Sequence, residues 1–245
     1  MPYKPECIRN VANWTKVSKE HKFEKNTFDG EKFKADMAKF SPKMVELMKT
    51  IAEVDAADMA THGKLFKHFI FSDLKQNGAK VLASALMAHG KRLAYDRKHE
   101  MFSDAELLRS RGENFVLLSS TTVYDKPIAV KTKKALLTKY NQRPENIQGD
   151  LVRFIILDSG FKEGIDLFDV KYVHIFEPQT SKADQKQAIG RATRTCGQKG
   201  LEFHPTQGWS LNVYVYDVGM DGKELRMGMG TVSYTHLTLP TILLV

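Results

Sequence analysis

The sequence predicts an α/β protein built on an open, mostly parallel sheet with helices on both faces. Three observations lead to this class: short continuous apolar runs recur along the chain, stretches with helical spacing separate them, and polar residues gather where three of the runs end. Such alternation is typical of a parallel sheet that is covered on both faces. The predicted strands are residues 68–73 (HFIFSD), 115–120 (FVLLSS), 153–159 (RFIILDS), 172–178 (YVHIFEP) and 211–218 (LNVYVYDV).

Helices are predicted before and between these strands. The first begins at Pro42, with Ser41 as its N-cap. A second has an apolar face and stops at Gly90, and a third covers residues 131–140. The apolar stripe of the first helix, which predicts packing against a core, consists of Met44, Met48 and Ile51.

Polar residues at the ends of the first three strands predict where a ligand binds. Carboxyl ends of parallel strands meet at one edge of a sheet, and open α/β sheets bind ligands there. We therefore expect the binding loops at this edge. Its polar residues are Ser72, Asp73, Ser119, Ser120, Thr121, Asp158, Ser159 and Gly160.

Composition bounds the class of partner. Lys and Arg number 37 against 29 Asp and Glu, a formal charge of +8 over 245 residues. This excess favours a polyanionic partner, most often nucleic acid, but it also fits a basic surface without a specific partner. Two distant cysteines, Cys7 and Cys196, indicate neither a disulfide framework nor a metal site. With no signal-peptide pattern and no long apolar run, we expect a soluble intracellular protein without a membrane partner.

The two ends of the chain differ from the middle. Residues 1–40 show no helical or strand period, so we expect a linker or the edge of a preceding domain. Residues 232–241 (VSYTHLTLPT) resemble a translated sequencing adapter, so we expect residues 232–245 to be an artefact. The predicted domain is residues 41–231, with native sequence that ends near Thr231.

The turn that follows the third strand, residues 159–166 (SGFKEGID), is a candidate binding loop. Gly160 and Gly164 would let backbone amides approach an anion closely. Asp166 could accept hydrogen bonds from ribose hydroxyls. The same glycines fit an ordinary strand-to-helix turn, so the loop alone leaves both interpretations open.

A second candidate is the segment 187–200 (QAIGRATRTCGQKG). Gln187, Arg191 and Arg194 would lie on one face of a helix, and Gly190 would allow a neighbouring backbone to approach. The planar guanidinium suits phosphate because it offers several rigid donors and stays charged. The alternative is a basic last turn that complements the helix dipole. The start of this helix is predicted at Lys182 by a capping box of Ser181 and Asp184.

QAIGRATR resembles motif VI of superfamily 2 helicases and translocases, Q-x-x-G-R-x-x-R. SGFKEGID resembles their motif V and HFIFSD their motif IV, and the order and spacing match across residues 41–218. FVLLSS, YNQRPENIQGD, EGIDLFDVKYVHIFEPQ and CGQKGLEF are similar to the large-DNA-virus branch, which includes poxvirus nucleoside triphosphatase I and early-transcription-factor ATPases. The resemblance implies a RecA-like lobe of the P-loop NTPase superfamily.

The resemblance also implies ligands and roles. ATP and Mg²⁺ would be held mainly by a first RecA-like lobe of the same polypeptide, and Arg191 and Arg194 would be the catalytic residues that meet the γ-phosphate. DNA or RNA would be a partner, together with viral transcription machinery. The protein would be located in the host cytoplasm or the virion. No residue is assigned to a metal. Nucleotide contacts would come from Gly164, Asp166, Gln187, Gly190, Arg191 and Arg194, and nucleic-acid contacts from Ser72, Ser119, Thr121, Ser159 and Lys162.

The sequence lacks the parts that hold ATP in this family. Neither the phosphate loop G-x-x-x-x-G-K-[ST] nor the acidic DExx motif occurs, because the Gly-Lys pairs in THGKLF and AHGKRL are not followed by Ser or Thr. Residues 1–67 are too few for a lobe of roughly 100–150 residues. We therefore expect the second lobe alone, inactive by itself and part of an ATP-dependent helicase or translocase when complete.

Two other functions are possible. A nucleic-acid-binding module without enzymatic activity could retain a RecA-like lobe, in which case the complete gene would still lack a phosphate loop. An unrelated α/β transferase could also carry a phosphate-binding loop, but it would not show motifs IV, V and VI in order. The pair Arg191 and Arg194 favours the motor lobe over the binding module, since such arginines have little use without a γ-phosphate.

Overall fold

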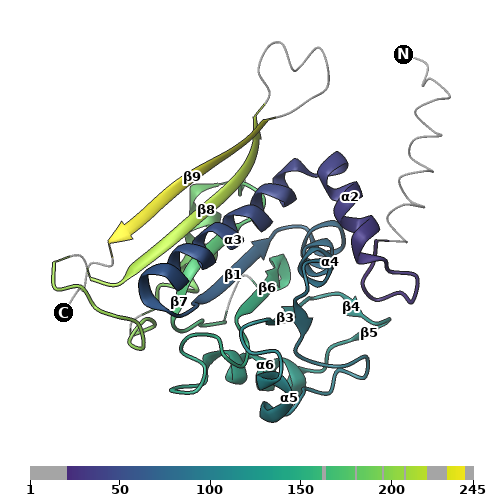
Figure 1. Ribbon diagram of the computed structural model, residues 1–245, viewed down its shortest axis with the longest axis horizontal. Helices are drawn as coiled ribbons and strands as arrows, with labels where there is room; N and C mark the ends of the chain where they lie inside the picture. Colours follow the sequence, from purple (N-terminus) through teal and green to yellow (C-terminus); the bar gives the residue numbers. More distant parts are fainter. Residues whose placement is uncertain are drawn as a thin grey trace.

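The computed structural model describes residues 21–161, 164–179, 181–194, 196–206, 208–219 and 231–240. Six strands of its main sheet run parallel and the seventh runs antiparallel, which confirms the predicted α/β class (Figure 1). All five predicted strands are present, and the short β2 and the last strand, β9, add to them. The order across the sheet is β2 (Arg92–Leu93), β3 (Asn114–Leu118), β6 (Phe154–Asp158), β1 (Lys67–Ser72), β7 (Val170–Ile175), β8 (Ser210–Gly219) and β9 (Thr231–Pro240).

Helices connect these strands, together with one two-stranded hairpin. Among the described residues, no helix is both long and apolar enough to cross a membrane. The helical elements are α2 (Gly30–Phe40), α3 (Pro42–His62), the π-helix η1 (Lys75–Ala79), α4 (Lys80–Ala88), α5 (Asp104–Leu108), α6 (Val130–Asn141), the 3₁₀ turn η2 (Ser159–Phe161) and α7 (Lys182–Gly190). The hairpin consists of β4 (Thr122–Val123) and β5 (Lys126–Pro127).

α3 begins at Pro42, as predicted, and its predicted apolar stripe is buried. Ser41 occupies the N-cap position, but its side chain makes no capping hydrogen bond. Ser41 also ends the preceding helix, where its backbone N–H donates to the carbonyl of Met37 at 2.9 Å. The predicted N-cap position of Ser41 is confirmed.

α2 was not predicted, because residues 1–40 showed no helical period. Asp29 caps this helix by accepting from the backbone N–H groups of Glu31 and Lys32. Phe33 and Met37, one turn apart, are both buried in the core that α4 and the sheet share. Residues 21–40 thus pack against the rest of the domain.

Neighbouring residues of β1 contact different helices. His68 lies 3.2 Å from the carboxylate of Asp55 in α3, and Lys67 donates to the carbonyl of Tyr140 in α6 at 2.9 Å. Side chains of successive strand residues point to opposite faces of a sheet. α3 and α6 therefore cover opposite faces, and Figure 1 shows α3 crossing in front of the strands.

A buried chain of polar side chains joins α3 to the sheet. Arg153 contacts Asp55 at 2.6 Å, Asp55 contacts His68, and His68 contacts His174 at 3.0 Å. His174 in turn lies 2.9 Å from the hydroxyl of Tyr216. Burial alone would raise the pKa of Asp55, but the hydrogen bonds and charges of His68 and Arg153 lower it to about 2. The carboxylate stays ionised and holds the helix in register with the strands.

β9 includes most of the stretch for which the sequence predicts an adapter origin. It pairs with β8 from Thr231 opposite Gly219 to Pro240 opposite Ser210. An edge strand offers its unpaired backbone to any β-prone segment, whatever its origin. The end of native sequence near Thr231 therefore stays a prediction.

Candidate functional site

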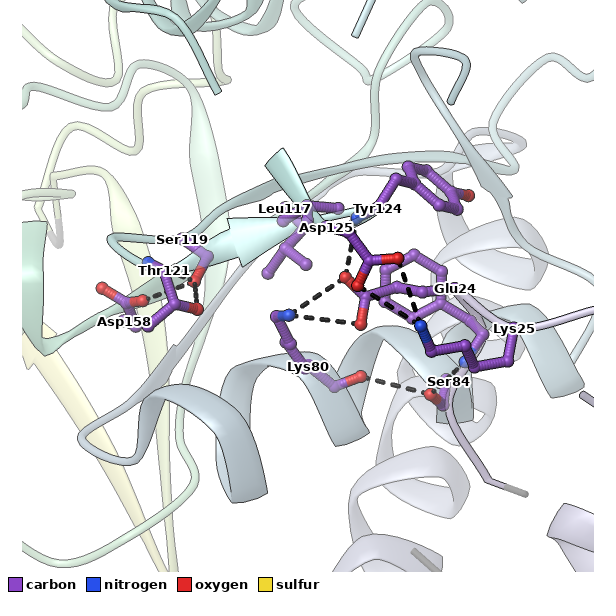
Figure 2. A network of polar contacts seen from close by, with 12 residues as sticks. Glu24, Lys25, Lys80, Ser84, Leu117, Ser119, Thr121, Tyr124, Asp125 and Asp158 are labelled. Carbon is purple, nitrogen blue, oxygen red and sulfur yellow. Dashed lines mark hydrogen bonds and ion pairs between the residues drawn. The ribbon is translucent and has the colours of Figure 1, made fainter. Parts of the chain in front are cut away.

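The carboxyl ends of β3 and β6 meet around one buried carboxylate, that of Asp158. It accepts from the Ser119 hydroxyl at 2.8 Å, the Ser120 N–H at 2.8 Å and the Gly160 N–H at 2.9 Å. Figure 2 shows the contact of Ser119 with Asp158 beside the side chain of Thr121. Asp158 thus ties the loops that follow two neighbouring strands, and the predicted edge is a single connected structure.

Three of the predicted phosphate contacts belong to this edge, and they differ in exposure. Ser119 is buried, and its hydroxyl is engaged by Asp158 and by the Thr121 hydroxyl at 2.8 Å. Thr121 and Ser159 are half-buried, and Ser120, in the loop that follows β3, is exposed. In this conformation solvent does not reach the Ser119 side chain, whereas it reaches Ser120 and, in part, Thr121 and Ser159.

Ser72, at the end of β1, is also fully buried. Its hydroxyl lies 3.0 Å from both Glu177 Oε1 and the Leu74 carbonyl, and the Asp73 N–H donates to Glu177 Oε2 at 3.0 Å. Burial raises the pKa of Glu177, and these hydrogen bonds oppose the rise. Ser72 therefore organises the end of β1 through Glu177, a residue that the sequence did not single out.

Glycine is needed at the two positions in the loop 159–166 for different reasons. A Cβ on Gly160 would lie 2.2 Å from Ser120 Cβ, so Gly160 is required where the ends of β3 and β6 pack together. Gly164 has φ +76 and no described atom within 4 Å of a Cβ, so it serves the turn itself. The backbone of Gly160 therefore lies close to Ser120 in this structure. Lys162, predicted to contact nucleic acid, lies outside the described residues.

α7 begins at Lys182, as predicted, and Ser181 Oγ accepts from the Asp184 N–H at 3.1 Å. The helix ends at Gly190, so the predicted helical row of Gln187, Arg191 and Arg194 was wrong. Arg191 is the C-cap residue, and Arg194 lies beyond the helix.

Carbonyl groups that follow the helix bind partners outside it. The Leu167 N–H donates to the Arg191 carbonyl at 2.9 Å, and the Gln198 side-chain amide donates to the Ala192 carbonyl. Nothing described lies within 4 Å of a Cβ placed on Gly190, so the backbone approach at this glycine stays a prediction. Tertiary hydrogen bonds shape the segment after Gly190.

The two candidate catalytic arginines lie in different environments. Arg191 is 2% exposed, whereas Arg194 is exposed and its Nε lies 2.7 Å from Asp166 Oδ1. Gln187 is exposed in the last turn of α7. The structure therefore brings together two of the predicted nucleotide contacts, Asp166 and Arg194. An exposed guanidinium beside an exposed carboxylate fits a nucleotide, which presents phosphate oxygens and ribose hydroxyls.

The described residues contain no group of three or more His, Cys, Asp or Glu side chains placed to hold a metal ion.

The described residues form an α/β domain whose parallel strands end at one polar edge, and the proteins similar to the chain in sequence are helicases. A candidate ATP-dependent RNA helicase of Acanthamoeba polyphaga mimivirus is 26% identical over 199 residues, 79% of this chain and 29% of that protein. The uncharacterized helicase of killer plasmid pGKL-2 of Kluyveromyces lactis is 34% identical over 104 residues, 42% of this chain and 16% of that protein. A second candidate ATP-dependent RNA helicase of the mimivirus is 30% identical over 95 residues, covering 39% of this chain and 11% of its own length.

The chain is thus a homologue of helicases from a large DNA virus and a yeast plasmid, and it spans less than a third of their length. No protein-family model matches it. Two solved structures are similar in shape. The C-terminal part of the Fun30 ATPase domain has a TM-score of 0.42 at 18% identity, over 64% of this chain and 38% of that one. The Pyrococcus furiosus Hef helicase domain has a TM-score of 0.37 at 19% identity, over 64% of this chain and 24% of that one.

Proposed function

We propose that the chain is the second motor lobe of an ATP-dependent helicase or translocase, and that it supplies arginines to ATP held by a first lobe. The observation that carries the proposal is the exposed pair of Arg194 and Asp166, 2.7 Å apart, within segments that resemble motifs VI and V. Homology to helicases over 79% of the chain supports it.

The roles of the residues follow from their chemistry. When bound between the lobes, ATP with Mg²⁺ supplies the phosphoanhydride bond that is cleaved. Arg194 exchanges Asp166 for phosphate oxygens, and its rigid fork stabilises the negative charge that develops there. Asp166, released from Arg194, accepts from ribose hydroxyls. Arg191 adds its charge to the same phosphate, while Gln187, Gly164 and Gly190 border the nucleotide.

The nucleic-acid strand is proposed to cross the carboxyl edge of β3 and β6. Thr121 and Ser159 contact backbone phosphates, and Ser120 joins them because it is exposed. Lys162 is a further proposed contact. Ser72 and Ser119 hold these loops in place through Glu177 and Asp158. Contacts of this kind position a strand without reading its sequence.

ATP hydrolysis by the purified chain tests the division between lobes. We expect no turnover, because the phosphate loop and the Mg²⁺ carboxylate belong to the first lobe. The measurement is phosphate release with nucleic acid present. Turnover that survives removal of contaminating ATPases and is lost in an Arg194→Ala variant would overturn the proposal.

Binding of single-stranded oligonucleotides tests the partner. We expect the dissociation constant to rise at least about 10-fold between 50 and 200 mM salt, with little dependence on sequence, because released counterions drive the association. Fluorescence anisotropy with homopolymers of equal length measures both. Binding that ignores salt, or that strongly prefers one sequence, would count against the phosphate-backbone contact.

A further inference from the structure

Two stretches that the sequence singled out, YNQRPENIQGD and CGQKGLEF, meet at a contact that the proposed function does not use. Arg143 and Asp169 form a two-point ion pair, with Nε 2.7 Å from Oδ2 and Nη2 2.7 Å from Oδ1. Arg143 Nη2 also donates to the carbonyls of Gly197, at 2.6 Å, and Cys196, at 3.3 Å. One guanidinium thus binds a carboxylate and the backbone that follows Arg194.

Asp169 holds the same backbone from the other side. Its side chain is fully buried, its N–H donates to the Gly197 carbonyl at 2.7 Å, and its Oδ1 accepts from the Gly200 N–H at 2.9 Å. A Cβ on Gly200 would lie 2.8 Å from Asp169 Oδ1, so this position must be glycine. We call the side chains of Arg143 and Asp169 the Arg143–Asp169 clamp.

The clamp completes a set of contacts along the segment that carries the candidate catalytic arginines. The Leu167 N–H binds the Arg191 carbonyl at 2.9 Å, and Asp166 pairs with Arg194. Asp169 then binds Gly197 and Gly200. A single stretch before β7 therefore fixes the beginning, the middle and the end of segment 191–200, and only the middle contact is exposed.

We propose that Arg143 and Asp169 are positioning residues for Arg191 and Arg194, a role that rests on the proposed function. Neither needs to touch the nucleotide. The clamp holds the backbone of segment 191–200, so that the exposed Arg194 side chain alone moves when a phosphate arrives. Catalytic groups must be held close to their productive geometry, and a shift of about 1 Å can lower a rate about 100-fold.

Hydrogen exchange in this chain tests the mechanical part of the proposal. Arg143→Lys keeps the charge but loses the fork, so amides in segment 191–200 should exchange at least about 10-fold faster, while the amides of β3 stay unchanged. The matched control is Arg111→Lys, which alters an exposed pair with Asp150 of the same 2.7 Å length and should leave segment 191–200 unchanged. Unchanged exchange in Arg143→Lys would overturn the proposal.

Steady-state kinetics of the full-length protein that carries the ATP-binding lobe tests the catalytic part. Arg143→Lys should lower kcat about 10- to 100-fold and leave KM for ATP within about 2-fold. Arg143→Ala should lose at least as much, and added ethylguanidinium should restore part of kcat because Arg143 is 30% exposed. A residue needed only for folding would give no such rescue, since guanidinium compounds favour unfolding.

The outcomes separate the two proposals. If Arg194→Lys lowers kcat but Arg143→Lys does not, the positioning role is overturned and the proposed function stands. If neither variant changes kcat, the proposed function fails and the positioning role fails with it. A loss of kcat in both variants, with rescue of Arg143→Ala by ethylguanidinium and none of Arg111→Ala, supports both.

Discussion

Two arginine–aspartate pairs contact segment 191–200 and have the same N–O distance, but they differ in burial and in their other hydrogen bonds. Arg143 lies 2.7 Å from Asp169, with side-chain exposures of 30% and 0%. Arg194 lies 2.7 Å from Asp166, with both side chains 53% exposed. The first pair also binds backbone carbonyls and an amide, and the second joins two loops at the surface.

The difference shows that distance does not determine what an ion pair does. An exposed pair contributes about 0–1 kcal/mol, because water solvates both charges when it opens. A buried carboxylate that loses its partner leaves a charge or its donors unsatisfied, and this costs about 3–5 kcal/mol. The Arg143–Asp169 clamp therefore holds the fold, and the Arg194–Asp166 pair can exchange with a ligand.

The largest expected effect on stability is that of Asp169→Ala. We expect a loss of about 3 kcal/mol in the free energy of unfolding, because three donors lose their acceptor and Ala replaces Asp at φ +57. Urea unfolding followed by circular dichroism, at constant m-value, measures the change.

The matched variant Asp166→Ala should change the free energy of unfolding by less than about 1 kcal/mol. Asp169→Asn separates the two causes of the larger loss, since Asn tolerates positive φ but loses the charge and one of the two acceptor oxygens. Equal losses in Asp169→Ala and Asp166→Ala would contradict the division between a buried and an exchangeable pair.

A smaller effect on the free energy of unfolding, per pH unit, is expected from Lys67, which is buried near the clamp. Burial lowers the pKa of Lys67 to about 7, and the charge of Asp169 only partly opposes it. Between pH 7 and the ordinary lysine value of 10.5, the unfolded chain holds a proton that the folded chain has released. The contribution of Lys67 to stability therefore rises with pH across this window, by up to about 1.4 kcal/mol per unit, and is lost as pH falls through 7.

Lys67→Met should remove this slope and leave the stability curve flatter between pH 7 and 10 than in the wild type. Urea midpoints across this range measure it. Lys64→Met is the control, since Lys64 pairs with an exposed glutamate near the surface. A wild-type curve that does not rise with pH, or an equal slope in Lys67→Met, would show that Lys67 keeps its charge in the folded state.

Local sequence was sufficient for the sheet and for the position of its polar edge. The five apolar runs became strands, and Ser119, Asp158 and Gly160 meet where the parallel strands end. The start of α7 was also readable, because Ser181 caps it within one turn. Such features depend on neighbours in sequence, and period and capping rules describe them directly.

Features that depend on residues distant in the sequence could not be predicted from it. α7 ends at Gly190, and Leu167, which precedes it in the sequence by a whole strand, binds the carbonyl of Arg191. Ser72 is closed off by Glu177, 105 residues away. The clamp joins residues 26 apart in sequence, and nothing local marks Arg143 among the basic residues of the chain. Long-range hydrogen bonds overrode the local pattern in each case.

The most direct measurement of the central claim is kcat of Arg194→Lys in the full-length protein. Lysine keeps the charge but not the fork that follows phosphoryl oxygens into the transition state, so we expect kcat to fall roughly 100-fold or more with KM for ATP nearly unchanged. Lys182→Gln, on the first turn of α7, should be nearly silent. If Arg194→Lys keeps the wild-type kcat and loses only thermal stability, Arg194 serves the end of the helix, and the claim that it acts on ATP is wrong.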